Sequence, residues 1–293
     1  MIGPLFRAPR RAPRASVMPT SLRRQTKNLV TDLFEYAMAP FGRWDRQTLV
    51  TETTDIGIRG LGAEFDGYRI AFLSDLHISP LVPSWWLARA VEAALALKPD
   101  MIALGGDFLD DDPHYIPLLS NILRPLRAPD GVVGVLGNHD HYVGADAVRE
   151  QIGRAGVREL FNEAIVLKRG TSRLAIGGVG DLERDIIDFE ATFGDVPETV
   201  PRLVVSHDPD VFAYWPEGMR LDLMLSGHTH GGQAHLPFIG PPFVPSQFGA
   251  RYLCGLIREG ERQLYVTRGV GVSGAPFRWR CPPELSELRL RTA

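Results

Sequence analysis

Cysteine is scarce in this chain, with only Cys254 and Cys281 among 293 residues. Two cysteines make neither a disulfide framework nor a thiolate zinc site, and they fit a reducing compartment. Uncharged apolar runs of about 18 residues are also lacking, so no membrane-spanning helix is expected. The net charge of −3 does not favour nucleic-acid binding. We therefore expect a cytoplasmic protein that does not bind nucleic acid.

Acidic residues are missing from residues 1–31, which carry several arginines and one lysine. Prolines interrupt residues 1–20, which are expected to be disordered. Apolar residues then recur at roughly helical spacing from Leu22 to Met38, and Pro40 would end such a helix. A basic amphipathic helix can lie on an anionic membrane surface, here the cytoplasmic face; the alternative is a helix packed on its own domain. Residues 1–52 are thus predicted to form a basic, partly disordered N-terminal segment.

Residues 53–293 show a regular alternation of apolar and polar stretches, which predicts a layered α/β domain. The crowding of strands in its second half favours two sheets with helices outside. Residues 236–250 hold four prolines and are expected to form a long loop. Strands are expected at 53–59, 68–73, 101–104, 132–136, 157–159, 164–168, 174–179, 202–205, 221–225, 263–267 and 285–290, and helices at 84–97, 115–126, 145–155 and 185–192.

Five short polar clusters each follow an apolar run that is predicted to be a buried strand. Strands that deliver carboxylate, imidazole or carboxamide groups at their C-terminal ends build the active sites of open α/β sheets. The clusters are Asp75-Leu76-His77, Gly106-Asp107, Gly137-Asn138-His139-Asp140, Ser206-His207 and Gly227-His228-Thr229-His230.

The residue types in these clusters indicate metal binding. Asp75 and His77 are two residues apart, so both can reach one ion, and His228 and His230 repeat that spacing. Nitrogen and oxygen ligands without thiolate suit Mn²⁺, Fe, Zn²⁺ or Co²⁺. Seven side chains are too many for one tetrahedral ion, and two ions about 3.5–4 Å apart could use them all. The seven candidate ligands are Asp75, His77, Asp107, Asn138, His207, His228 and His230.

The pattern resembles the calcineurin-like metallophosphoesterase superfamily, whose signature reads D-x-H, G-D-x-x-D, G-N-H-D/E, H and G-H-x-H. Every element is present, with Asp110 as the second aspartate. The resemblance implies a four-layer α/β-β/α sandwich of two mixed β-sheets flanked by helices, over residues 53–293. It also implies two divalent metal ions and hydrolysis by attack of a metal-activated hydroxide. Asp107 would bridge the two ions.

The same resemblance implies a catalytic role for the residues that follow Asn138. His139 would protonate the leaving oxygen or stabilise transition-state charge, and Asp140 would orient His139. One ion would be held by Asp75, His77, Asp107 and His230, and the other by Asp107, Asn138, His207 and His228.

Finer motifs resemble the branch of bacterial YaeI- and YkuE-like phosphodiesterases. They are residues 227–233, 252–256, 268–271 and 276–278. The branch also looks similar to a chlamydial enzyme that hydrolyses UDP-2,3-diacylglucosamine in lipid A synthesis. This suggests a phosphodiester or pyrophosphate substrate such as a lipid-linked nucleotide. Two alternatives stay open, a phosphoprotein phosphatase and a non-catalytic metal-binding interaction module.

Aromatic and basic residues outside the clusters each allow a functional and a structural interpretation. Trp85 and Trp86 adjoin the start of a predicted helix, so at least one could be exposed and meet an acyl chain or a membrane surface. Core packing is the alternative. Arg251, Arg268, Arg278 and Arg280 include candidates for binding a substrate phosphate, although surface arginine is the default expectation.

Overall fold

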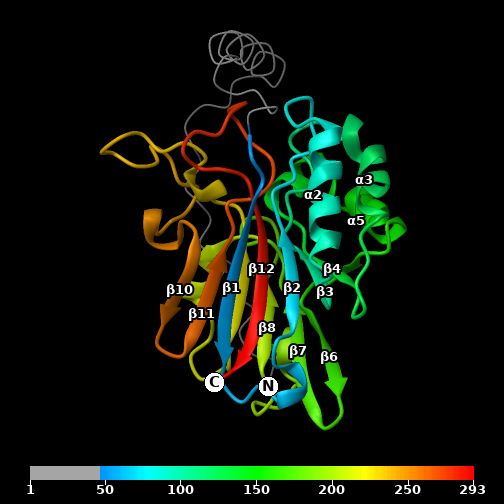
Figure 1. Ribbon diagram of the computed structural model, residues 1–293, viewed down its shortest axis with the longest axis vertical. Coiled ribbons are helices and arrows are strands. Elements are labelled where there is room, and N and C mark those ends of the chain that lie inside the picture. Colours follow the sequence, from blue (N-terminus) through cyan, green and yellow to red (C-terminus); the bar gives the residue numbers. More distant parts are fainter. Residues whose placement is uncertain (1–46) are drawn as a thin grey trace.

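The computed structural model describes residues 47–293, which form two six-stranded β-sheets (Figure 1). Each sheet mixes parallel and antiparallel pairs. The order in the first sheet is β1 (Val50–Ile58), β12 (Glu284–Thr292), β2 (Arg69–Leu73), β3 (Met101–Leu104), β4 (Val132–Gly134) and β5 (Arg158–Glu159). The order in the second is β10 (Gly255–Glu259), β11 (Arg262–Val266), β9 (Leu223–Ser226), β8 (Arg202–Val205), β7 (Ser172–Gly178) and β6 (Glu163–Arg169).

Helices cover the outer faces of both sheets. On the first sheet lie α2 (Ser84–Ala96), α3 (Ile116–Leu123) and α5 (Ala145–Arg154), which form the right-hand layer of Figure 1. The second sheet is covered by the short helix α6 (Phe189–Phe193) and the 3₁₀ segment η4 (Pro209–Tyr214). The remaining helical segments are η2 (Ala63–Phe65), η3 (Pro113–Tyr115), α4 (Asn138–Val143), η5 (His230–Gly232) and η6 (Gly249–Tyr252).

Apolar side chains of the two sheets pack against each other in a central core. Phe72 of the first sheet and Leu203 and Leu225 of the second are buried in it. Separate apolar clusters hold the helices on the outer faces. The predicted sandwich of two mixed sheets flanked by helices is therefore confirmed.

Most predicted elements agree with the structure within a few residues, and two strands agree at both ends, namely β3 and β8. One strand was not predicted, β10, which pairs with β11. The helix predicted for residues 185–192 begins only at Phe189, where Asp188 caps it by accepting a hydrogen bond from the Ala191 amide. Residues 185–187 precede this cap and lie outside the helix.

The two tryptophans at the start of α2 differ in environment. Trp86 is buried and donates its indole N–H to the carbonyl of Val270, whereas Trp85 is half exposed. The basic segment predicted for residues 1–52 falls mainly on residues 1–46, outside the described part. Within residues 47–293, no helix combines the length and the apolarity needed to cross a bilayer.

Parallel pairing gathers the predicted ligands at one edge of the sandwich. In the first sheet β2, β3 and β4 run parallel, and in the second β7, β8, β9 and β11 do so. All five polar clusters follow the C-terminal ends of β2, β3, β4, β8 and β9. The clusters meet there because both sheets present their C-terminal strand ends at that edge.

Candidate metal centre

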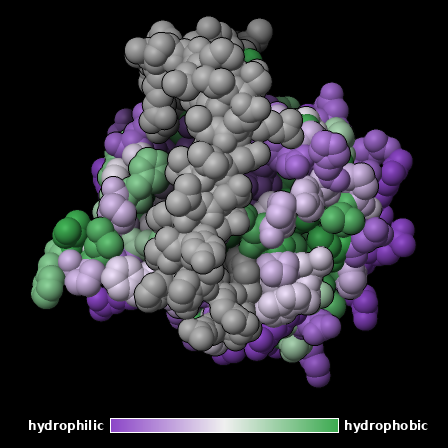
Figure 2. Space-filling view, turned by 90° about the horizontal axis from the view of Figure 1, so that it is seen from above, coloured by the Kyte–Doolittle hydropathy of each residue, from purple (hydrophilic) through white to green (hydrophobic). Residues whose placement is uncertain are grey.

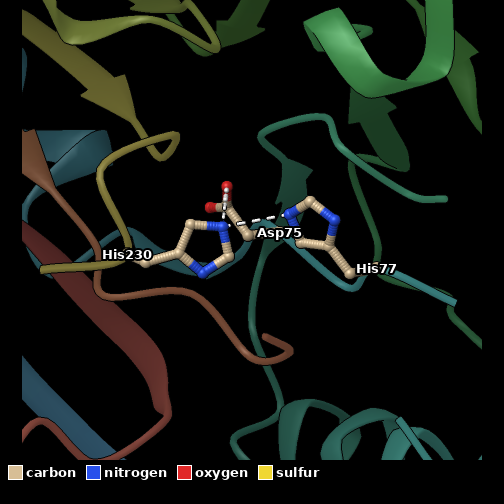
Figure 3. A group of neighbouring side chains, drawn as sticks. All are labelled: Asp75, His77 and His230. Atoms are coloured by element: carbon tan, nitrogen blue, oxygen red, sulfur yellow. Dashed lines mark hydrogen bonds and ion pairs between the residues drawn. The ribbon is translucent and has the colours of Figure 1, made fainter. Parts of the chain in front are cut away.

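One group of three side chains combines residues from both sheets. Asp75 and His77 follow β2, and His230 follows β9. His230 Nε2 lies 3.0 Å from His77 Nε2 and 3.5 Å from Asp75 Oδ1, so the three groups converge on one point (Figure 3). Asp75 and His77 are fully buried. These three residues could hold one metal ion.

A second group of three lies beside the first. It consists of Asp107 after β3, His207 after β8 and His228 after β9. His207 Nε2 lies 3.2 Å from Asp107 Oδ2 and 3.1 Å from His228 Nδ1. This second trio could hold another ion.

Asp107 connects the two groups. Its Oδ2 lies 3.2 Å from His207 Nε2 and 3.6 Å from His77 Nε2. Burial opposes its ionisation, but the imidazoles of His207 and His139 outweigh burial and hold the pKa of Asp107 well below its usual range. A carboxylate that stays ionised between two imidazole sets is suited to bridge two cations.

The backbone at these ligands adopts an unusual conformation. Positive φ angles are rare for residues other than glycine and cost free energy, so they persist where surrounding contacts hold them. The candidate ligands with positive φ are Asp75 (56°), His77 (45°), Asp107 (50°), His228 (67°) and His230 (52°). This concentration of strained backbone marks the loops as a functional site.

The outer ring nitrogens of two of the imidazoles lie close to oxygen atoms. His207 Nδ1 lies 2.7 Å from the Gly105 carbonyl and donates its proton there, because a carbonyl only accepts. His77 Nδ1 lies 3.3 Å from Asp110 Oδ1, within ion-pair distance, but makes no hydrogen bond among residues 47–293. In both rings Nε2 faces the other ligands of its group, the arrangement typical of metal-ligating histidines.

His230 has a different neighbour on its outer nitrogen. Arg278 Nη2 lies 3.3 Å from His230 Nδ1, and the buried guanidinium also donates to the carbonyls of Arg268 and Gly271. Burial, together with the charges of His77 and Arg278, holds the pKa of His230 well below its usual value. His230 thus stays neutral, as a ligand must. The default expectation of a surface arginine is wrong for Arg278.

Asn138, the seventh candidate ligand, begins α4. Its amide nitrogen donates to the Tyr142 hydroxyl at 3.0 Å, which fixes the side chain with its oxygen on the other side. That oxygen is buried and has no hydrogen-bond partner within the described residues. Buried unpartnered oxygens are rare in proteins, and a cation would satisfy this one.

His139 lies against the first group, with its ring edge-on to His77 at a centroid distance of 4.8 Å. Its Nδ1 lies 3.0 Å from Asp111 Oδ1 and 3.5 Å from Asp110 Oδ1. Burial disfavours the imidazolium, but Asp107 and Asp111 outweigh it and raise the pKa of His139 to about 9. His139 is therefore a protonated group beside the centre.

The carboxylate of Asp140 contacts backbone amides. It accepts hydrogen bonds from the amides of Phe108, Leu109 and Gly137 at 2.9, 3.2 and 3.0 Å. Asp140 thereby joins the loop after β3 to the start of α4. The carboxylates beside the His139 ring are instead Asp110 and Asp111, so any effect of Asp140 on His139 passes through the backbone.

Two further residues of the site were not identified as such from the sequence. Asp111 adjoins His139, and Asp181 follows β7 with one carboxylate oxygen that is buried and has no hydrogen-bond partner among residues 47–293. Burial raises the pKa of Asp181 to about 6, against the lowering effect of His207 and His228 nearby. Asp181 follows an apolar strand, as the five clusters do, so the same sequence pattern could have identified it. Arg278 was expected from the sequence only as a candidate for a substrate phosphate, and its position 3.3 Å from His230 Nδ1 was not predicted.

The donor set as a whole fits divalent cations. Two histidine pairs bring ring nitrogens within about 3 Å of each other, and the carboxylates beside them are buried. Charges are buried at such density only when they are paired or bind metal. Sulfur is absent from both groups, so the ligands are those preferred by Mn²⁺, Fe, Zn²⁺ and Co²⁺.

Fold and ligand set together define a metal-dependent phosphoester hydrolase. A family model described as calcineurin-like phosphoesterase matches residues 68–232, and the chain belongs to that family. Its members normally bind two divalent metal ions.

Among curated proteins, the chain is 38% identical to Phosphodiesterase YaeI of Escherichia coli over 76% of this chain and 82% of that protein. It is 32% identical to the uncharacterized metallophosphoesterase YkuE of Bacillus subtilis, over 82% of this chain and 86% of that protein. Among solved structures, TT1561 of Thermus thermophilus matches with a TM-score of 0.45 and 14% identity, over 70% of this chain and 90% of that one. The resemblance to the YaeI- and YkuE-like branch is confirmed.

Proposed function

We propose that residues 53–293 form a dinuclear metal-dependent phosphodiesterase or pyrophosphatase. The observation that carries this proposal is the pair of buried ligand groups joined through Asp107, with protonated His139 beside them. The name of the YaeI relative supports a phosphodiester substrate.

The proposed roles follow the two groups. Asp75, His77 and His230 would hold one ion, and Asn138, His207 and His228 would hold the other. Asp107 would bind both.

When bound, two divalent cations neutralise phosphoryl oxygens and lower the pKa of water, which allows in-line attack at phosphorus. The protein's own contribution is to hold the ligands in place before binding. The Gly105 carbonyl fixes the ring of His207 through its Nδ1 proton, and Asp110 Oδ1 lies 3.3 Å from Nδ1 of His77.

His139 supplies positive charge and a proton at the leaving oxygen. Asp111 and Asp110 keep the imidazolium protonated at Nδ1, so the ring is charged at neutral pH. A charged imidazolium stabilises negative charge on the leaving group, and proton transfer to that oxygen completes the cleavage.

For the physiological substrate we propose a lipid-linked nucleotide, such as UDP-2,3-diacylglucosamine. The proposal rests on the motifs shared with the phosphodiesterase branch, and it places the protein in the cytoplasm, at the cytoplasmic face of the membrane. Contact with an anionic membrane through the N-terminal segment belongs to the same proposal. If removal of residues 1–40 leaves liposome binding unchanged, that segment is not the contact.

The first test is hydrolysis after reconstitution with Mn²⁺, Zn²⁺, Mg²⁺ or Co²⁺. The substrates are bis-p-nitrophenyl phosphate, p-nitrophenyl phosphate, a phosphopeptide and UDP-2,3-diacylglucosamine. We compare the wild-type protein with His139→Ala and with His114→Ala, a control at an exposed histidine. His139→Ala should lose at least 100-fold in kcat and keep its metal, whereas His114→Ala should match the wild type.

Each outcome separates the candidate functions. If the wild-type protein hydrolyses the lipid nucleotide and His139→Ala does not, the full proposal is supported. Diester turnover alone supports the chemistry and rejects this substrate, and a preference for phosphopeptide indicates a protein phosphatase. Two bound ions without turnover indicate an interaction module.

A further inference from the structure

The three most exposed large apolar side chains in residues 47–293 lie in one loop. They are Phe238, Ile239 and Phe243, with relative exposures of 109%, 74% and 69%. The loop is the gold segment that projects from the upper left of Figure 1. Figure 2, which looks down on the same end, shows a green projection at its left edge, where this loop lies.

The tip of the loop is a tight hairpin rather than an irregular segment. Leu236 and Gly240 exchange two backbone hydrogen bonds of 2.9 Å, which leaves Phe238 and Ile239 at the turn. Phe238 has a φ of 65°, a conformation that strains a bulky residue and that glycine or asparagine adopts more easily. A strained aromatic residue thus occupies a turn position where no packing requires it.

The composition of the loop points to lipid. No Asp, Glu, Lys or Arg occurs from residue 236 to residue 250. Trp279 lies beside the base of the loop, because its carbonyl accepts a hydrogen bond from the His235 amide, and exposed Arg280 follows it. Exposed aromatics with a basic residue at their edge are typical of segments that enter the interfacial region of a bilayer.

The size of the tip argues against a stable protein partner. Three such side chains expose on the order of 500 Å². A standard protein interface needs about 800 Å² from each partner. A projecting tip without charge also offers no complementarity to a charged partner surface, whereas insertion into lipid needs neither a large flat area nor matching charges.

The base of the loop ties the tip to the metal centre. Only five residues separate His230 from Leu236. A Cβ on Gly232 would lie 2.3 Å from Pro241 Cβ, so the loop packs directly on the segment that follows His230. The Gln233 side chain donates to the carbonyls of Ser273 and Ala275, which fixes that segment further.

From these observations we infer that the hairpin at residues 236–243 inserts its apolar tip into a lipid bilayer and holds the metal centre at the membrane surface. The inference concerns binding, so it holds or fails independently of catalysis. It also differs from membrane contact through residues 1–46, because the two segments can be altered separately.

The test measures where residue 238 lies when the full chain meets vesicles of phosphatidylethanolamine and phosphatidylglycerol in equal parts. In Phe238→Trp, vesicles with brominated acyl chains should quench the added tryptophan fluorescence at least twofold. Val166→Trp, at a partly exposed position on β6, is the matched control and should not be quenched.

A second variant removes the tip. The triple change Phe238→Ser, Ile239→Ser and Phe243→Ser should lower the vesicle partition coefficient at least tenfold. Leu118→Ser with Val166→Ser, at exposed apolar positions elsewhere, should leave it unchanged. Turnover of bis-p-nitrophenyl phosphate in solution should be the same in all variants, which separates failure of this inference from failure of the proposed function.

Three results would overturn the inference. Vesicle binding with an unquenched residue 238 would assign the contact to another segment. Blue-shifted emission of that residue without lipid would mean that the chain itself covers the tip. If the protein were a dimer and the triple change dissociated it, the tip would be a contact between two copies of the protein.

Discussion

The carboxylate of Asp107 contacts both ligand groups of the metal centre. One of its oxygens faces both His77 and His207, and the other accepts the amide of His139 at 2.9 Å. Its carboxylate therefore organises both ligand groups and the loop that presents His139.

Replacing this carboxylate should cost metal as well as activity. Asp107→Asn removes the charge that two cations would share, so metal content should fall below two ions per chain and diester turnover by at least 100-fold. Elemental analysis after gel filtration measures the metal. Asp146→Asn, at a fully exposed surface position, serves as the control and should keep both ions. Two tightly held ions in Asp107→Asn would disprove the bridging role.

At the scale of elements, close backbone packing sets the ligand geometry. The Gly227 loop after β9 lies directly on the loop after β2, and the His228 amide donates to Asp75 at 3.0 Å. A Cβ on Gly227 would lie 2.1 Å from Ser74 Oγ and 2.3 Å from Asp75 Oδ2. The two sheets approach each other here as closely as a bare backbone allows.

Gly227→Ala should therefore separate these loops. We expect a loss of about 2 kcal/mol in the free energy of unfolding, as for other overpacked sites, and weaker binding of the ion near Asp75. Urea denaturation and metal titration measure the two effects. Gly153→Ala is the matched control, because it lies in α5 with open space around it. If Gly227→Ala matched the control in both measurements, the close packing would have no role in metal binding.

A buried carboxylate joins three neighbouring strands of the first sheet. Glu287 of β12 accepts hydrogen bonds from Thr53 of β1 at 2.8 Å, from Arg69 of β2 at 2.9 Å, and from Arg289 at 2.8 Å. Burial alone would raise its pKa, but the bonds from Arg289 and Arg69 outweigh burial and lower the pKa of Glu287 to about 2.

This pKa shift predicts a pH dependence of stability. The folded pKa lies below the unfolded value of about 4.3, so the stabilisation is complete above that pH and is lost as the pH falls towards 2. Glu287→Gln should destabilise the protein at pH 6, and its deficit relative to wild type should shrink by about 1.5 kcal/mol between pH 5 and pH 3. Urea denaturation at each pH measures this. Glu261→Gln, in an exposed ion pair, should show no such trend. A constant deficit across that range would contradict the shift.

The sequence predicts single elements better than their arrangement. The strand before each polar cluster was predictable because apolar runs and polar ends are local features, as for β3 and β8. The position of β12 between β1 and β2 was not, because it depends on pairing between residues more than 200 positions apart. The contact of Arg278 with His230 was not predictable either, because it joins residues 48 positions apart. The roles of the seven ligands and His139 stay predictions.

At the scale of the whole molecule, the metal centre lies where the two sheets meet. It places several buried carboxylates close together. Asp75 and Asp107 are buried, and Asp140 has a pKa raised to about 7 by burial and by Asp107. Cations would relieve this repulsion, so the folded protein should depend on them.

Removing the metal should therefore lower the thermal stability of the entire domain. If each ion binds only the folded chain and is present at 1,000 times its Kd, each contributes about 4 kcal/mol. The Tm should then fall by at least about 10 °C after chelation and recover when Mn²⁺ is added back. Scanning calorimetry measures both steps, with Asp107→Asn as the variant that should recover least. An unchanged Tm after chelation would mean that the fold is stable without ions.

The placement of β12 also bears on how the protein is made. A ribosome completes every other strand before Glu284–Thr292, yet this strand lies between β1 and β2 and pairs with both. Until it emerges, β1 has no neighbour in its sheet, and β2, which carries Asp75 and His77 at its end, presents an open edge. The second sheet needs no such late strand and can assemble during synthesis. The sheet that carries His207, His228 and His230 can thus form before β12 pairs with β1 and β2.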